Sequence, residues 1–231
     1  MEEFNGFPRE LIAFYRGLRE NNSKSWFDTH RRDFDNFVME PARRFVIAMG
    51  ERLRSISPEI HSDPRINKSI FKIHRDVRFS RIKTPFKTHL ALWFWEGQRK
   101  RMECSGYYFH LDPDSLMLGA GIYRFPPNLL GEFRDSVVHP KYGPPLVKVM
   151  DEISKRDSYT FGGMHYKRTP RGYDPEHENA DLLLHNGLYV GMESAVPDEL
   201  YSSKLLDYCY RRYSDMAPLH RWLVAMVERA G

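Results

Sequence analysis

Apolar residues at the start of the chain recur at helical spacing. Within residues 8–20, four large apolar residues stand at positions i, i+3, i+4 and i+7, namely Leu11, Phe14, Tyr15 and Leu18. Pro8 suits a first helical position, and Ser23 or Ser25 can cap a second helix. Pro41 either kinks that helix or starts a new one. The pattern predicts an all-helical N-terminal section.

From about residue 69 the period changes from helical spacing to two. Within residues 69–79 the odd positions are mostly apolar and the even positions mostly polar, which is typical of a half-buried strand with one wet face. Three further strand-like runs follow, at 88–95, 104–112 and 115–124. Because these runs are short and their links have the length of turns, we expect a central antiparallel β-meander.

The second half of the chain returns to helices. One helix is predicted from Pro126-Pro127 and another over 144–155, and an irregular or β-rich section runs from 159 to 196. Two helices, roughly 202–213 and 216–229, close the chain. The fold class that we predict is α+β, with N-terminal helices, the central meander and C-terminal helices, in one domain over 1–231.

Composition narrows the class of protein without fixing its function. The 231 residues are 41% hydrophobic and 29% charged, as in ordinary globular proteins, and the formal net charge is +4. Two cysteines do not make a disulfide framework, which favours a reducing compartment. The acidic N-terminus lacks the apolar segment of a secretory signal, and no apolar run approaches the ~20 residues that span a bilayer. We expect a cytoplasmic protein without membrane contact.

Charge is concentrated between Lys68 and His89. That stretch holds seven cations against one acid, Asp76, so its net charge is +6 and the remainder of the chain sums to −2. A basic run of this kind must find anions elsewhere, either on a ligand or on the protein. Residues 174–200 hold seven acids and neither Lys nor Arg, so a structural clasp between the two segments is an open alternative.

The leading hypothesis is a cationic pocket on the sheet for an anionic small molecule that carries phosphate or carboxylate. Arg binds such groups through a bidentate fork and Lys as a point charge. The candidate ligand-binding residues are Lys72, His74, Arg75, Arg78, Lys83, Lys87, Tyr108 and Tyr123. His89 and His110 are candidate catalytic acid–base groups, because imidazole exchanges protons near neutral pH, and Asp76 is expected to orient a neighbouring Arg. Gly119 and Gly121 would let a ligand approach the sheet, or simply accommodate bulges and large facing aromatics.

Other kinds of site find less support in the sequence. His74-x-Asp76 and His110-x-Asp112 are the nearest approach to metal-ligand spacing, so no metal site is predicted. The chain has no GxSxG elbow and no dinucleotide-binding fingerprint, and no pattern specifies a cofactor or an oligomeric state. Basic residues interleaved with Phe71, Phe79 and Phe86 could contact phosphates and stack on bases. A non-enzymatic module that binds nucleic acid or an acidic protein is therefore the alternative hypothesis.

The segment RDVRFSRIKTPFKTH at 75–89 resembles a largely bacterial family, the conserved domain of unknown function 2461. Its signature is similar to R-D-x-R-F-S-x-x-K-T-P-Y-K-T-H, and further similarities extend over nearly the whole chain, including Gly106–His110 and 167–173. The chain departs from the family at Phe86, where Tyr is usual, at Arg81-Ile82 in place of Lys-Asp, and at His185-Asn186, where the family tends to be basic. The missing hydroxyl at Phe86 argues against a phenol-dependent step there. The resemblance implies membership, and it implies no activity because the family has none to transfer.

Overall fold

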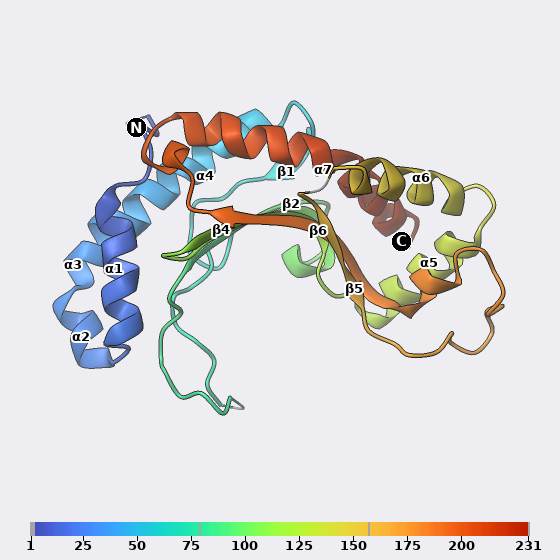
Figure 1. The fold of residues 1–231 in the computed structure, drawn as a ribbon, viewed down its shortest axis with the longest axis horizontal. Helices are drawn as coiled ribbons and strands as arrows, with labels where there is room; N and C mark the ends of the chain where they lie inside the picture. Colours follow the sequence, from blue (N-terminus) through green and yellow to red (C-terminus); the bar gives the residue numbers. More distant parts are fainter. Residues whose placement is uncertain (1–2, 79, 157, 231) are drawn as a thin grey trace.

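The N-terminal section is helical, as the apolar spacing predicted. A computed structural model describes residues 3–78, 80–156 and 158–230, and Figure 1 shows the path of the chain. The first helical segments are α1 (Arg9–Glu20), α2 (Lys24–Thr29), α3 (Arg31–Asp33), the π-helical η1 (Phe34–Met39) and α4 (Glu40–Leu53). Ser23 caps α2, because its side chain accepts a hydrogen bond from the Trp26 backbone N–H. The chain stays helical through Pro41, which stands in the first turn of α4 directly after the π-helical turn. The wider turn accommodates a residue that has no backbone N–H to donate.

A six-stranded antiparallel sheet forms the middle of the molecule. Its strands are β1 (Ile60–His61), β2 (Leu90–Glu96), β3 (Ser105–Leu111), β4 (Ser115–Ile122), β5 (Thr160–Met164) and β6 (His185–Ala195), in the order β1-β2-β3-β4-β6-β5. The consecutive strands β2, β3 and β4 confirm the predicted meander. The later β-rich section joins the same sheet, with β6 paired between β4 and β5.

The predicted strand at 69–79 is wrong. Two backbone hydrogen bonds tie residues 69–71 to the edge of β2, and the chain then leaves the sheet. Two more, from Lys87 N to Ile73 O and from Arg75 N to Pro85 O (both 2.8 Å), close residues 73–87 on themselves. The apolar positions have separate causes, because Phe71 packs against Trp93 and Trp95 whereas Ile73 is buried in the main core. We call residues 72–89 the basic loop; its Phe79 lies outside the described residues.

The remaining helices follow the predictions with one correction. They are the 3₁₀ turn η2 (Arg101–Glu103), α5 (Pro127–Val138), α6 (Gly143–Ser154), the 3₁₀ turns η3 (Ala180–Leu184) and η4 (Asp198–Tyr201), and α7 (Lys204–Arg229). The two predicted C-terminal helices are a single helix that passes through Pro218. A proline inside a helix costs about 3 kcal/mol, and α7 offsets this cost because its buried face continues from Tyr213 through Leu219 to Leu223. No helix in the described ranges is both long and apolar enough to cross a membrane.

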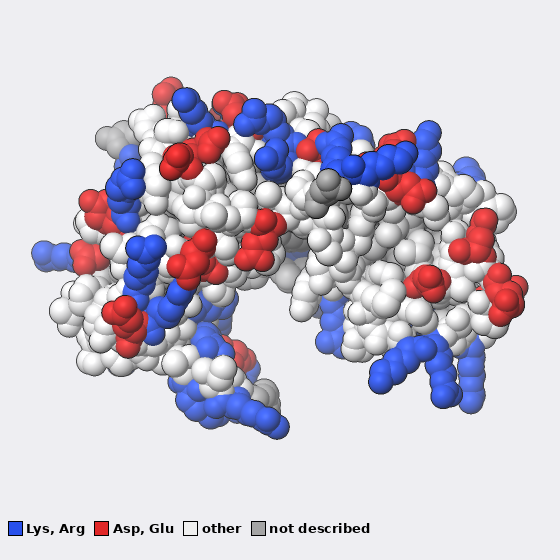
Figure 2. Space-filling view, viewed as in Figure 1, with Lys and Arg blue, Asp and Glu red and all other residues white. Residues whose placement is uncertain are grey.

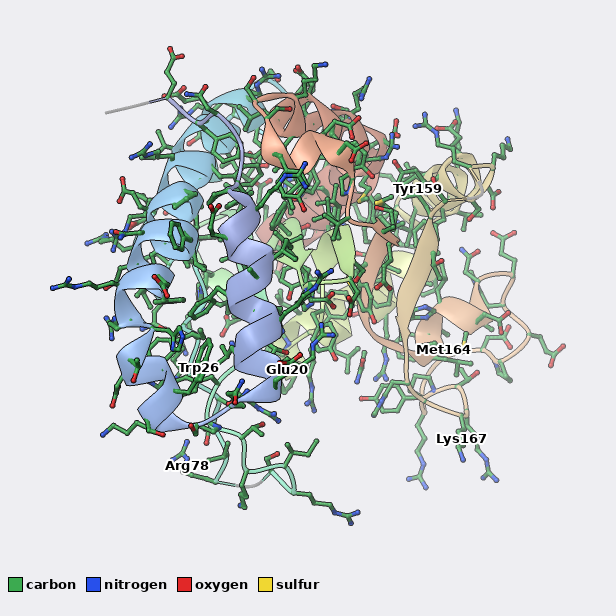
Figure 3. All side chains as sticks on the ribbon, turned by 60° about the vertical axis from the view of Figure 1, so that its left-hand side comes forward. Glu20, Trp26, Arg78, Tyr159, Met164 and Lys167 are labelled. Carbon is green, nitrogen blue, oxygen red and sulfur yellow. The ribbon has the colours of Figure 1, made fainter. Side chains whose placement is uncertain are left out.

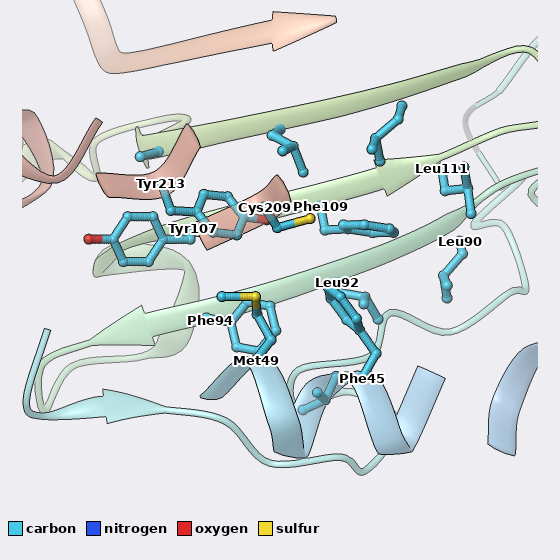
Figure 4. Packing of buried hydrophobic residues seen from close by; sticks show 14 of the residues in the cluster. Phe45, Met49, Leu90, Leu92, Phe94, Tyr107, Phe109, Leu111, Cys209 and Tyr213 are labelled. Carbon is cyan, nitrogen blue, oxygen red and sulfur yellow. The ribbon is translucent and has the colours of Figure 1, made fainter. Parts of the chain in front are cut away.

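Helices α4 and α7 cover one face of the sheet (Figure 1). Alternate residues of β2 and β3, including Leu92, Phe94 and Phe109, pack there against Phe45 of α4 and Tyr213 of α7, as Figure 4 shows. The opposite face, which we call the open face, carries Trp93, Tyr108, His110, Met117, Gly119 and Gly191. Its only large buried residues in the described chain are the tryptophans of β2, which form a small separate cluster with Cys104.

Asn22 fastens the basic loop to the helical section. Its side-chain amide donates to the Phe86 carbonyl and accepts from the Phe86 N–H, both at 3.0 Å. The Phe86 ring stacks on Phe27 with centroids 4.4 Å apart. Phe86 therefore packs in the core, and the hydroxyl that is usual in the family would stand beside these rings rather than in the open face.

We predict that Asn22→Ala lowers the free energy of unfolding by about 1–3 kcal/mol, because two part-buried backbone groups lose their partners. Urea unfolding followed by circular dichroism measures the change. Asn21→Ala is the matched control, since the Asn21 amide bonds only the exposed Gly17 carbonyl of its own helix end. Equal losses in the two variants would show that Asn22 does not fasten the loop.

Candidate functional site

Strand register gathers the candidate residues on the open face. His110 of β3 pairs with Met117 of β4, and Tyr108 pairs with Gly119, which in turn pairs with Gly191 of β6. A Cβ built at Gly119 or Gly191 would meet only the backbone of the neighbouring strand, at 3.1 and 3.2 Å. The two glycines therefore form a bare floor beside Tyr108. Gly121 instead fits the alternative that a strand glycine serves the backbone, because its φ is +133° and a Cβ there would lie 2.3 Å from the Leu188 carbonyl oxygen.

Two histidines and a tyrosine form a cluster at one end of this floor. The rings of His89 and His110 stack with centroids 4.1 Å apart, and the Tyr108 hydroxyl lies 3.1 Å from His110 Nδ1. Burial, reinforced by the charge of Lys87, lowers the pKa of His89 to about 4. Burial likewise lowers the pKa of His110 and raises that of Tyr108 to about 12. At neutral pH both imidazoles are therefore uncharged and able to accept a proton.

Two cations lie over the ring of Phe71 beside this cluster. Lys87 Nζ lies 5.4 Å from the Phe71 centroid, and the Arg101 guanidinium lies 4.6 Å from it. Burial and the charges of Lys72 and Arg101 lower the pKa of the Lys87 ammonium. Within the described ranges Lys87 makes no ion pair. A half-buried cation is thus held among like charges.

The other candidates from the basic loop lie at different distances from the histidine cluster. Arg75 donates to the Thr84 hydroxyl at 2.8 Å and stands close enough for its charge to lower the pKa of His89. Arg78 is exposed and pairs with Asp76 at 2.7 Å, and Lys83 donates to the Val77 carbonyl at 3.0 Å. Asp76, Arg78 and Lys83 therefore lie in the outer part of the loop, away from His89.

Two candidates lie away from the histidines altogether. His74 packs beside Phe86, with ring centroids 5.1 Å apart, on the helical side. The expectation that Lys72, His74 and Arg78 share a strand face fails because that strand is absent. Tyr123 follows the end of β4, 72% exposed, with its ring 5.5 Å from that of Tyr189. It belongs to the opposite end of the open face.

The structural clasp finds little support. Among the residues whose placement is described, no ion pair joins the basic loop to 174–200. One acid of that segment, Glu193, does approach the site, since its charge acts to raise the pKa of His110. The described chain also holds no group of three His, Cys, Asp or Glu side chains arranged to bind a metal ion.

Sequence reasoning missed Arg101 and Trp93. Arg101 stands in η2, between β2 and β3, and reaches Phe71 only because residues 69–71 pair with β2. The Trp93 indole N–H donates to the Arg101 carbonyl at 3.0 Å and fixes that turn. The contact of Arg101 with Phe71 depends on which strand the basic segment pairs with, and no local sequence pattern predicts that pairing.

The depressed pKa of His89 predicts a pH dependence of stability. Because the folded pKa, about 4, lies below the ordinary value of 6.5, the unfolded chain binds more protons between these values. The free energy of unfolding therefore falls as pH drops from about 6.5 toward 4. We expect the free energy of unfolding, measured with urea, to fall less between pH 7 and pH 5 in His89→Gln than in the parent chain. An imidazole NMR titration of His89 with a midpoint near 6.5 would contradict the assignment.

Comparison with known proteins places the chain in a family. No curated protein matches it. The model of a family described as "Conserved hypothetical protein (DUF2461)" matches residues 10–222, which extend from α1 into α7 and include the whole sheet. The resemblance predicted from 75–89 is thus confirmed over nearly the entire length, and the chain belongs to the family DUF2461.

Proposed function

We propose that the open face beside the basic loop binds a small molecule that carries a phosphate or carboxylate group. The observation that carries the proposal is Lys87, half-buried beside Lys72 and Arg101 without an acidic partner in the described chain. Burying a cation among like charges costs free energy that a bound anion recovers. Cations arranged in this way are typical of binding sites rather than of structural ion pairs.

The surroundings of Lys87 suit an anionic group. Lys87 supplies a mobile point charge, and Arg101 supplies a planar donor whose face is already occupied by Phe71. The bare backbone at Gly119 and Gly191 leaves room for the remainder of the ligand next to Tyr108. The site is half-covered, so the charges act through a lower dielectric than at the exposed loop tip.

His89 and His110 add the capacity to move a proton. Both are neutral at pH 7, so either is able to take a proton from a bound group rather than give one. A bound anion stabilises the imidazolium form and raises the pKa of His89 toward neutrality. This coupling supports acid–base chemistry on an anionic substrate as the function of the site.

We predict that a phosphorylated or carboxylated ligand stabilises the chain and that Lys87→Gln abolishes the effect. A panel of inorganic phosphate, nucleotides, sugar phosphates and dicarboxylates is screened by thermal shift. A ligand present at 100 times its Kd raises the free energy of unfolding by about 2.7 kcal/mol. In a chain of this size each kcal/mol raises Tm by roughly 2–4 °C. The unliganded Lys87→Gln protein is expected to match or exceed the parent in Tm, because a repelled, half-buried charge is removed.

Lys83→Gln is the matched control. It removes one charge from the same loop at an exposed position outside the histidine cluster. It should keep the ligand response, as should Arg78→Ala, which removes the exposed pair with Asp76. If all three variants respond alike, or no member of the panel raises Tm, the proposal fails.

A second candidate function, binding of single-stranded nucleic acid, is favoured by the distribution of exposed cations. Figure 2 shows Lys and Arg gathered on two arms on either side of a hollow. One arm is the basic loop, with Arg81 and Lys83 exposed; the other carries the exposed residues Lys167, Arg168 and Arg171. Figure 3 shows Arg78 and Lys167 at the same end of the molecule on these opposite arms. Two basic arms on either side of a sheet face that carries Tyr108 suit the phosphate backbone and the bases of a single strand.

For this candidate we predict binding that weakens steeply with salt. Replacing Lys167, Arg168 and Arg171 by Gln in one variant should reduce the slope of log K against log salt by about 2. Each phosphate contact with a single strand contributes about 0.7 to that slope. Fluorescence anisotropy of a labelled oligonucleotide at several salt concentrations measures the slope. A flat response, or an equal affinity for an acidic peptide, removes the nucleic-acid function; the peptide result would favour an acidic protein partner.

A further inference from the structure

A cavity of about 630 Å³ lies at the end of the open face that is remote from the histidines. Five separate parts of the chain line it: the η2 turn, the segment that follows β4, helix α5 as far as Arg134, Tyr166, and Asn186 of β6. The residues that carry the argument are Met102, Tyr123, Arg124, Leu130, Arg134 and Tyr166. A volume of this size suits one small organic molecule.

The lining exposes apolar surface that folding normally buries. Of the six large hydrophobic side chains that are most exposed in the described residues, three line this cavity: Met102 (46%), Tyr123 (72%) and Tyr166 (38%). Single exposed hydrophobic residues are ordinary, whereas several around one hollow indicate a binding surface. Two tyrosine rings and a thioether favour a flat, polarisable group.

Arg134 gives the cavity a directed positive charge. Its guanidinium stands 5.0 Å from the Tyr166 ring, and its Nε is buried without a hydrogen-bond partner. Within the described ranges Arg134 also makes no ion pair. An arginine that lines a cavity without an acidic partner is suited to donate to a bound anion. Arg124 adds a second cation, against one acidic lining residue, Glu103.

We propose that this cavity is a binding site for a small molecule with a planar ring and one anionic group, either phosphate or carboxylate. The ring stacks on Tyr123 and Tyr166, and the anion accepts from Arg134. The site is separate from that of Lys87. Met117 marks the histidine end of β4 and Tyr123 follows its other end, six residues later, so Tyr123 lies roughly 20 Å from the histidine cluster at about 3.3 Å per residue. The η2 turn stands between the two sites, with Arg101 beside Phe71 and Met102 in the cavity.

Two methionines allow each site to be observed in one experiment. Met102 lines the cavity, and Met117 pairs with His110 on the open face. The chain is labelled with ¹³C-methyl methionine, and the two signals are assigned from Met102→Leu and Met117→Leu. Adenosine monophosphate and indole-3-acetate are titrated as ring-bearing anions, with adenosine as the uncharged control and inorganic phosphate as the ring-free control.

The expected result is a saturable shift of the Met102 signal with at least one ring-bearing anion, at least tenfold weaker with adenosine and absent with phosphate. A response to only one of the two probes supports the site and identifies which anion it takes. Failure of both to move Met102 at millimolar concentration, or a shift produced equally by phosphate, overturns the proposal. A shift of Met117 alone also overturns it, while supporting the Lys87 site.

Variants then test the roles of the lining residues. Arg134→Met should weaken the binding that Met102 reports at least tenfold, and Tyr166→Leu should weaken it several-fold. Tyr166 is at the surface, so Tyr166→Leu remains informative if Arg134→Met fails to fold. Lys87→Gln should leave the Met102 titration unchanged. Unchanged affinity in both Tyr166→Leu and a folded Arg134→Met would refute the assignment.

Discussion

Burial of a single face of the antiparallel sheet is the constraint on which the rest of this structure depends. Helices α4 and α7 pack against Leu92, Phe94 and Phe109, and this cover buries every second residue of these strands. The residues that alternate with them must then face the other way, whatever their chemistry. In β3 these residues are Tyr108 and His110, so the same period of two that builds the core also presents an imidazole and a phenol on the open face.

The basic loop is fixed at both ends and extends away between them. Residues 69–71 pair with the edge of β2, and Asn22 holds the Phe86 backbone near the point where the loop returns to the sheet. Fixed ends place Lys87 and His89 beside His110, whereas Lys83 stands in the outer part of the loop. One charged stretch therefore acts in two environments: a half-buried inner part, where charges interact strongly, and a hydrated outer part, where they are screened.

Local patterns predicted most of the elements, and long-range pairing accounts for the errors. The helical spacing of α1 and the short strand-like runs of β2–β4, joined by short links, are local signals, so these elements could be inferred directly. The alternation at 69–79 has several causes, because Phe71 packs beside Trp93 and Trp95 whereas Ile73 is buried in the main core after the chain has left the sheet. His89 and His110 were candidates by residue type, but their stacking depends on strand register, and the approach of Arg101 to Phe71 depends on an edge pairing; no local pattern encodes either.

The electrostatics of the histidine cluster and of the cations beside it are coupled. Burial holds His89 neutral, and the neighbouring positive charge of Lys87 acts in the same direction. The acids that act the other way on these histidines, Asp112 and Glu193, do not pair with Lys87. An anion bound among the cations would thus reverse the sign of the local potential and favour protonation of His89 in the same step. Anion binding and proton uptake at this site are therefore linked through one charge balance. The basic loop determines that balance, because it holds its inner cations beside the histidines.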